Sequence, residues 1–141
     1  MRSWAISAVF GLTILITAGC THTGSPKDDE TVSQMNSIAA GIQATLAARP
    51  DVTGAKVVYQ HDFTISGEAI VSLTAKPGAN KQAIIDESIK LIWTSKLNPL
   101  HSIEIGVADP KDPSLGITKS LTPLSPQDVA ALEKQYGPRP K

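Results

Sequence analysis

Two alternating segments, one on each side of a helical pattern, constrain the fold of this chain more than any other feature. Alternation of apolar and polar residues runs through residues 68–76 (EAIVSLTAK) and residues 102–108 (SIEIGVA). This pattern predicts two strands that each bury one face. Residues 81–97 between them carry apolar side chains at helical spacing. If the strands share a sheet, this helix is a right-handed crossover and the strands are parallel.

Local signals place the remaining elements. Thr31 and Gln34 have the spacing of a capping box, so we expect a helix from residue 31 that Pro50 stops. Residues 55–60 (AKVVYQ) predict a strand, joined to the next by a turn-rich connection. Residues 115–117 predict a short edge strand and residues 118–124 a connector. Ser125 and Pro126 then begin a last short helix.

These elements predict an α+β domain in the form of a two-layer sandwich. The predicted order is α-β-β-α-β with a short C-terminal helix, and two helices cover one face of a small mixed sheet. We expect the domain to span residues 31–118, and residues 119–141 to form the connector and the last helix. Aromatic residues make up 4% of the chain, so the core must be aliphatic, with Trp93 as one large anchor.

The first twenty residues form a separate unit. Arg2 is the only charge before Cys20, and Trp4–Ala18 is an apolar run of 15 residues. That run has the length of a signal-peptide core and is shorter than the ~20 residues that a spanning helix needs. It ends in Thr17-Ala18-Gly19-Cys20, which resembles the lipobox of bacterial lipoproteins. The departure from that motif is Thr17, where the family most often has Leu.

The resemblance implies how the chain is processed and where it lies. It implies cleavage between Gly19 and Cys20, an S-diacylglycerol on the Cys20 sulfur and an acylated amino group. Residues 1–19 are then a signal peptide, and residues 20–30 are a lipid-anchored flexible tether. The acyl chains would hold the domain at the extracytoplasmic face of the cell membrane. An ordinary cleaved leader and an uncleaved N-terminal anchor are the alternatives.

The order of elements in residues 31–108 also resembles that of small periplasmic BON-type domains. The glycine-centred strand signature of that family is matched loosely by Ser66-Gly67 ahead of Val71-Ser72-Leu73. The resemblance implies a domain that binds lipid surfaces or other proteins and has no catalytic activity.

Composition and spacing exclude several kinds of site. Lys and Arg number 13 against 13 Asp and Glu, with no basic cluster, so we expect no nucleic-acid partner. Cys20 is the only cysteine, so no internal disulfide forms. His22, His61 and His101 lie on segments that we do not expect to converge, so we predict no metal site and no cofactor.

Catalytic residues are not expected either. Ser66, His61 and Asp62 supply the three side chains of a hydrolytic triad, but residues so close in sequence seldom adopt triad geometry. The candidate binding face is the polar side of the sheet, which carries Lys56, Glu68, Ser72, Thr74 and Glu104. We therefore expect a non-catalytic binding or interaction module with an envelope protein as its partner. A small membrane-tethered hydrolase, and a carrier with a pocket between helices and sheet, are the alternatives.

Replacing Cys20 with Ser tests the lipid anchor. The variant lacks the thiolate that accepts diacylglycerol, so it should move from the detergent phase to the aqueous phase in a partitioning experiment. Each acyl methylene contributes about 0.8 kcal/mol to membrane binding, so two or three chains give stable attachment. Mass spectrometry of the mature N-terminus checks the same point: an unmodified Thr21, or cleavage well upstream of Cys20, would contradict the prediction.

Overall fold

The computed structural model describes residues 26–62 and 64–141. The α-helices are α1 (Pro26–Ala47), α2 (Lys81–Trp93) and α3 (Pro126–Tyr136), and Pro113–Leu115 form a single 3₁₀ turn, η1. The strands are β1 (Val52–Gln60), β2 (Glu68–Ala75), β3 (Ser102–Ala108) and β4 (Ile117–Leu121). The α+β class is confirmed. Within the described residues, we find no helix with the length and apolarity needed to cross a bilayer.

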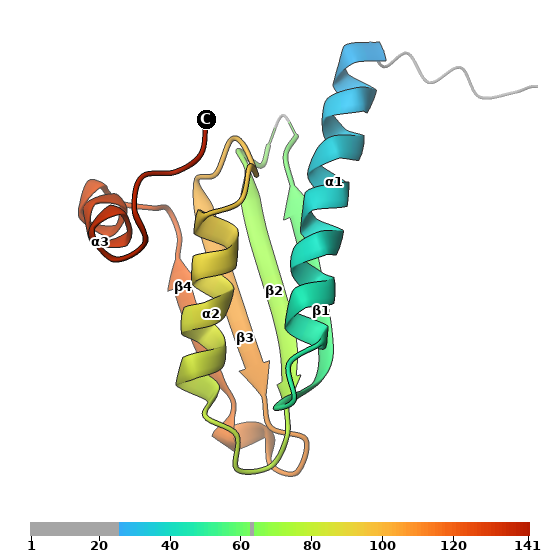
Figure 1. The fold of residues 1–141 in the computed structure, drawn as a ribbon, viewed down its shortest axis with the longest axis vertical. Helices are drawn as coiled ribbons and strands as arrows, with labels where there is room; N and C mark the ends of the chain where they lie inside the picture. The colour runs from blue at the N-terminus through green and yellow to red at the C-terminus, as the bar shows by residue number, and fades with distance from the viewer. Residues whose placement is uncertain (1–25, 63) are drawn as a thin grey trace, which may run out of the picture.

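The four strands form one mixed sheet in the order β1-β2-β3-β4. The pair β1–β2 is an antiparallel hairpin, β2–β3 is parallel, and β3–β4 is antiparallel. The parallel pair is joined by α2, which is the crossover that the alternating segments predict. Both α1 and α2 lie on the same face of the sheet (Figure 1). The order of the first three strands and the two-layer arrangement are therefore as predicted.

The core lies between this helix pair and the sheet. Apolar side chains on alternate positions of β2 and β3 point into it and meet one face of each helix. Side chains with at most 1% exposure include Leu46, Ile84, Ile92, Trp93, Val71, Ile103 and Ile105. The predicted aliphatic core, with Trp93 buried within it, is confirmed.

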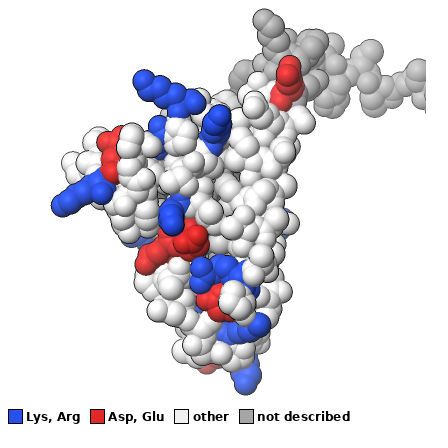
Figure 2. Space-filling model, viewed as in Figure 1, with Lys and Arg blue, Asp and Glu red and all other residues white. Residues whose placement is uncertain are grey.

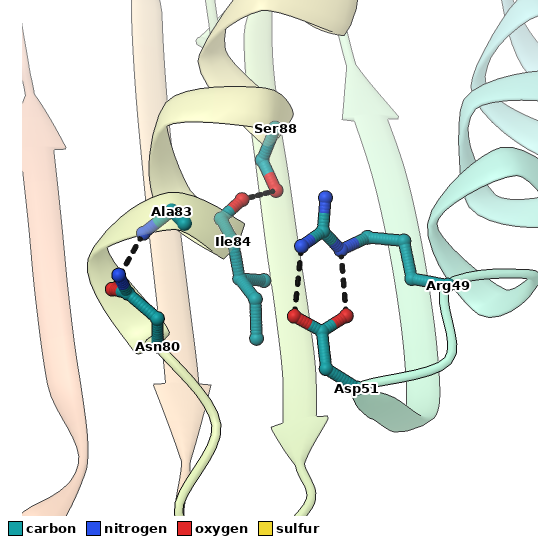
Figure 3. Close-up of polar contacts among 6 residues, drawn as sticks. All are labelled: Arg49, Asp51, Asn80, Ala83, Ile84 and Ser88. Carbon is teal, nitrogen blue, oxygen red and sulfur yellow. Dashed lines mark hydrogen bonds and ion pairs between the residues drawn. The ribbon is translucent and has the colours of Figure 1, made fainter.

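Side-chain caps fix where two helices begin. The side chain of Asn80 accepts a hydrogen bond from the backbone N–H of Ala83 at 3.1 Å, which caps α2 (Figure 3). At α3, Ser125 Oγ accepts from the N–H of Asp128, and Asp128 Oδ2 accepts from the N–H of Ser125. This reciprocal pair satisfies two backbone donors at once. Both starts were predicted.

A bidentate ion pair holds the turn between α1 and β1. Arg49 Nε and Nη2 donate to the two carboxylate oxygens of Asp51 at 2.9 and 2.8 Å (Figure 3). The hydrogen bond from Arg49 lowers the pKa of Asp51. Because both side chains are partly exposed, we assign the pair a role in fixing the geometry of the turn rather than a large stabilising effect.

The structure corrects the predicted start of α1. The helix begins at Pro26, so residues 26–30, which we assigned to the flexible tether, are helical. Proline is favourable at the first helical position, and acids are favourable near a helix N-terminus, where Asp28, Asp29 and Glu30 stand. The apparent capping box at Thr31 therefore lies inside the helix. Residues 20–25 lie outside the described residues.

The predicted connector at residues 118–124 is also wrong in its first half. Residues 117–121 form β4, which pairs with β3 along its length. The predicted edge strand at 115–117 instead contains the last residue of η1, Leu115, and the first residue of β4, Ile117. Ile117 and Leu121 point to the helix side, where they pack against the core. Two smaller corrections concern boundaries: β1 begins at Val52 rather than residue 55, and α2 ends at Trp93 rather than residue 97.

The C-terminal residues belong to the domain. Leu132 of α3 is buried in the core, and the Trp93 indole Nε1–H donates to the carbonyl of Gly137 at 2.8 Å. The guanidinium of Arg139 lies 5.6 Å from the centre of the Trp93 ring and donates to the carbonyl of Leu97. The predicted boundary at residue 119 thus separates segments that pack together.

Replacing Leu46 with Ala tests the packing of α1 on the sheet. Leu46 has no exposed surface, so truncation leaves a cavity, and we expect the free energy of unfolding to fall by about 2–5 kcal/mol. The matched control is Val32→Ala on the same helix, which changes a side chain that is 51% exposed and should shift stability by less than about 0.5 kcal/mol. Urea denaturation of both variants measures the difference. Equal effects would contradict the packing described.

Candidate functional site

The sheet has one face that neither α1 nor α2 covers, and we call it the open face. Its residues alternate along the strands with those that face the helices. It consists of Lys56, Val58, Gln60, Glu68, Ile70, Ser72, Thr74, Ser102, Glu104, Gly106, Thr118 and Ser120. The five residues of the predicted binding face all lie on it. Lys56, Ser72 and Glu104 are exposed, while Glu68 and Thr74 are half-buried.

Strand register arranges these side chains in rows across the sheet. One row contains Lys56, Ser72, Gly106 and Thr118, each directly opposite the next. The neighbouring row contains Val58, Ile70, Glu104 and Ser120 in the same way. Val58 and Ile70 therefore form a half-buried apolar pair. Lys56 lies next to Val58 along β1, and Glu104 lies next to Ile70 across the sheet on β3.

The open face has a shallow depression at Gly106. It has a volume of about 370 Å³, and its lining includes Ser72, Thr118, Pro113 and Gly116. A Cβ atom at Gly106 would meet nothing within 4 Å, so the missing side chain leaves free space above the strand. The depression can therefore accept a small side chain from a molecule that docks on this face.

The charges of the open face have no ion-pair partners within the described part of the chain. The two ion pairs found there are Arg49–Asp51 and Lys81–Asp109. The second joins the start of α2 to the end of β3 at 3.0 Å, with both side chains largely buried. Lys56 and Glu104 are thus solvated charges of opposite sign on a surface that the fold itself does not use.

Sequence reasoning missed part of this face. It assigned Thr118 and Ser120 to a connector. In the structure these residues belong to β4, where they lie beside Gly106 and Glu104. It also treated Ile70 as an exception to the alternation of its strand. The register shows that Ile70 pairs with Val58, so the exception marks the apolar centre of the open face. Two apolar residues on the polar sides of neighbouring predicted strands were the available signal.

His61, Asp62 and Ser66, which we did not expect to form a hydrolytic triad, lie in the connection between β1 and β2. Asp62 Oδ1 accepts hydrogen bonds from the N–H groups of Thr64 and Ile65 and from the Thr64 hydroxyl, at 2.7–2.8 Å. These bonds lower the pKa of Asp62, and the bond from the Thr64 hydroxyl has the largest effect. His101 Nδ1 contacts the carbonyl oxygen of Ser66. The Asp62 carboxylate therefore shapes its own turn, and the imidazole that reaches Ser66 comes from His101.

A groove lies where the N-terminal half of α1 passes the end of β1. It has a volume of about 520 Å³, and its lining mixes apolar Val32, Met35 and Tyr59 with polar Asn36 and Gln60. The Tyr59 hydroxyl donates to the carbonyl of Pro99 at 2.5 Å, and burial raises its pKa. The groove lies at the rim of the helix layer, whereas the space between helices and sheet is filled by the core.

Charge is distributed unevenly over the helix-covered side. Lys, Arg, Asp and Glu side chains gather near α2, α3 and the lower end of the domain, and the surface over α1 has few of them (Figure 2). Residues 31–48 contain no charged residue at all. Beyond its first turns, which contain Lys27, Asp28, Asp29 and Glu30, α1 therefore has no charged side chain and offers no ion-pairing chemistry.

Of the three histidines considered as metal ligands, the structure describes His61 and His101, and neither belongs to a candidate metal cluster. Within residues 26–62 and 64–141, there is no cluster of three or more His, Cys, Asp or Glu side chains that could hold a metal ion. Gly19, Cys20 and His22 lie outside the described residues, so the lipidation and cleavage site stays a prediction.

Substitution of the charged residues of the open face should leave the free energy of unfolding almost unchanged, whereas loss of the Lys81–Asp109 ion pair should lower it. Lys56→Gln and Glu104→Gln remove exposed charges without partners, so each should shift the free energy of unfolding by less than about 0.5 kcal/mol. Asp109→Asn should lower it measurably, because Asp109 accepts from Lys111 N–H and binds Lys81.

The pH dependence of unfolding separates these effects. The hydrogen bond from Lys111 N–H and the contact with Lys81 lower the pKa of Asp109 in the folded chain. The ionised Asp109 side chain therefore contributes fully to the free energy of unfolding above its pKa in the unfolded chain, about 3.9. This contribution is lost as the pH falls through the lower pKa of Asp109 in the folded chain. Asp109→Asn should reduce the loss of stability in this acidic range. Urea midpoints of wild type and variant that fall in parallel would contradict this.

No protein-family model, curated protein or solved structure matches this chain. The resemblance to BON-type domains therefore stays a prediction drawn from the order of the elements.

Proposed function

We propose that this chain is a bacterial lipoprotein whose domain acts as a non-catalytic interaction module of the cell envelope. The acyl chains on Cys20 anchor it at the extracytoplasmic face of the membrane, and the open face binds a protein partner. The observation that carries the proposal is a four-stranded surface that neither α1 nor α2 covers. It has an apolar centre and three charged residues, Lys56, Glu68 and Glu104, which form no ion pair within the described residues.

The sequence before α1 supports the anchored arrangement. Five residues, Thr21–Ser25, lie between the lipidated cysteine and Pro26, so six Cα–Cα steps join the two. Fully extended, they span at most about 20 Å. The N-terminus of α1 and the adjoining end of the sheet would therefore stay near the bilayer. The strands run along the same direction as α1 (Figure 1), so the open face would stand upright on the membrane and face sideways.

The arrangement of polar groups supports binding rather than catalysis. The carboxylate of Asp62 is engaged by its own turn, and Asp109 and Asp128 are engaged by caps and an ion pair. The free charges stand apart on opposite sides of Val58 and Ile70. Such a pattern resembles a protein interface, where an apolar centre is bordered by polar residues that set orientation.

The groove beside α1 favours a second candidate function, the binding of a small amphipathic molecule. Its lining mixes apolar and amide side chains, and it is open to solvent on one side. An acyl chain is a poorer occupant, because leaving the bilayer costs about 0.8 kcal/mol per methylene and the groove leaves one side of the chain exposed to solvent. We therefore separate this function from the lipid anchor.

Site-specific photo-crosslinking in intact cells tests the proposal. A benzophenone side chain at Ser72 probes the open face, one at Asn36 probes the groove, and one at Glu133, which is exposed on α3, is the matched control. We expect protein adducts from Ser72 that are absent from Glu133. No adduct at Ser72, or equal adducts at all three positions, would rule out binding at the open face. Small-molecule adducts at Asn36 alone would favour the second candidate.

A further inference from the structure

We propose that the partner of the open face is a second copy of the same chain, bound face to face about a two-fold axis. The inference deepens the proposed function and rests on it, because it uses both the open face and the lipid anchor. Lys56 and Glu104 are exposed charges of opposite sign that border Val58 and Ile70 on this face.

The positions of these charges define one symmetric docking. Lys56 lies on β1 and Glu104 on β3, two strands away and one row further along. In a two-fold interface, if Lys56 faces the partner's Glu104, then Glu104 faces the partner's Lys56. The axis must then lie between the two sheets and pass midway between the two residues. A single docking thus forms two identical ion pairs.

The same axis matches the other residues of the face. Neighbouring residues of the open face are about 4.8 Å apart across the strands and about 6.8 Å apart along them. These spacings give the position of each residue after the two-fold rotation. To within about 3 Å in projection, Val58 faces the partner's Ile70 and Ser72 faces the partner's Gly106. Thr74 faces the partner's Thr118. Apolar groups meet apolar groups, hydroxyls meet hydroxyls, and the Ser72 side chain enters the depression at Gly106.

The direction of this axis suits two chains anchored in one membrane. With those strand spacings, the axis runs roughly 35° from the strands. The N-terminus of α1 lies at the end of the sheet where β1 finishes and β2 begins (Figure 1). Rotation about the axis leaves the N-termini of both copies on the same side of the dimer. Both tethers therefore reach the same bilayer, which an axis perpendicular to the strands would prevent.

The size of the face indicates a weak dimer that needs the anchor. The open face measures roughly 20 Å in each direction, or about 400 Å² per copy, which is half of a standard stable interface. In dilute solution such a contact dissociates readily. Confinement of both copies to one membrane surface raises their effective concentration and favours the paired state. The dimer should therefore depend on anchoring.

A cysteine crosslink in native membranes tests the inference on the full chain. Copies of residue 72 would lie about 4 Å apart in projection across the axis, with the sheets about 10 Å apart. Ser72→Cys treated with a short bismaleimide should yield a crosslinked dimer. Glu133→Cys on α3 and the parent chain are the controls, and both should stay monomeric.

Charge reversal then identifies the docking. Lys56→Glu and Glu104→Lys should each lower the crosslinked fraction roughly tenfold, because each places like charges opposite one another twice. The double variant with both reversals should restore it. Glu68→Lys is the matched control on the same face: its position falls beyond the edge of the partner's β1, so the crosslink should persist.

The outcomes separate this inference from the proposed function. No crosslink at residue 72, a crosslink that ignores the charge reversals, or a double variant that fails to recover overturns the second copy as occupant. If the chain is anchored and Ser72 photo-crosslinks a different protein, the interaction module stands and the dimer does not. A dimer that forms equally well in the unanchored Cys20→Ser chain overturns the dependence on the membrane.

Discussion

One-sided burial of the mixed sheet is the constraint on which the rest of the structure depends. The parallel pairing of β2 with β3 requires a crossover, and α2 packs on one face of the sheet as it returns. The apolar sides of β1 and β2 face the same layer, so α1 joins α2 there. All the large apolar side chains of the strands then point one way, except Val58 and Ile70. The other face is left to polar residues and these two.

The termini of the elements show how a short chain without disulfides keeps this arrangement. Asn80 and Ser125 satisfy free N–H groups at the starts of α2 and α3. At the edge of the sheet, Gln43 of α1 accepts a hydrogen bond from the Val57 N–H at 3.0 Å. This contact uses a backbone donor that would otherwise invite another strand. The free edge at β4 is short and carries Lys119, which also discourages strand pairing. Within the described residues, each edge therefore carries a feature that discourages strand pairing, whereas α1 and α2 leave the open face uncovered.

The placement of charge links this fold to its proposed role. Ion pairs within the chain hold junctions: Arg49 and Asp51 set the turn into β1, and Lys81 and Asp109 join α2 to the end of β3. Lys56 and Glu104 form no ion pair within the described residues. Together with the half-buried apolar pair, these solvated charges are the features of the open face on which the proposed partner would act. A membrane anchor would hold such a face upright and next to its neighbours.

The sequence by itself determined the alternation of the strands, the helix between them, the start of the last helix at Ser125 and the α+β class, because each depends on local patterns of residues along the chain. It also placed Lys56, Glu68, Ser72, Thr74 and Glu104 on one side of the sheet. Tertiary structure alone decided that Ile117 and Leu121 extend the sheet, because a five-residue strand is stable only when β3 supplies its hydrogen bonds. It alone set Val58 beside Ile70 and Gly106 between Ser72 and Thr118, because strand register depends on contacts between segments far apart in the chain.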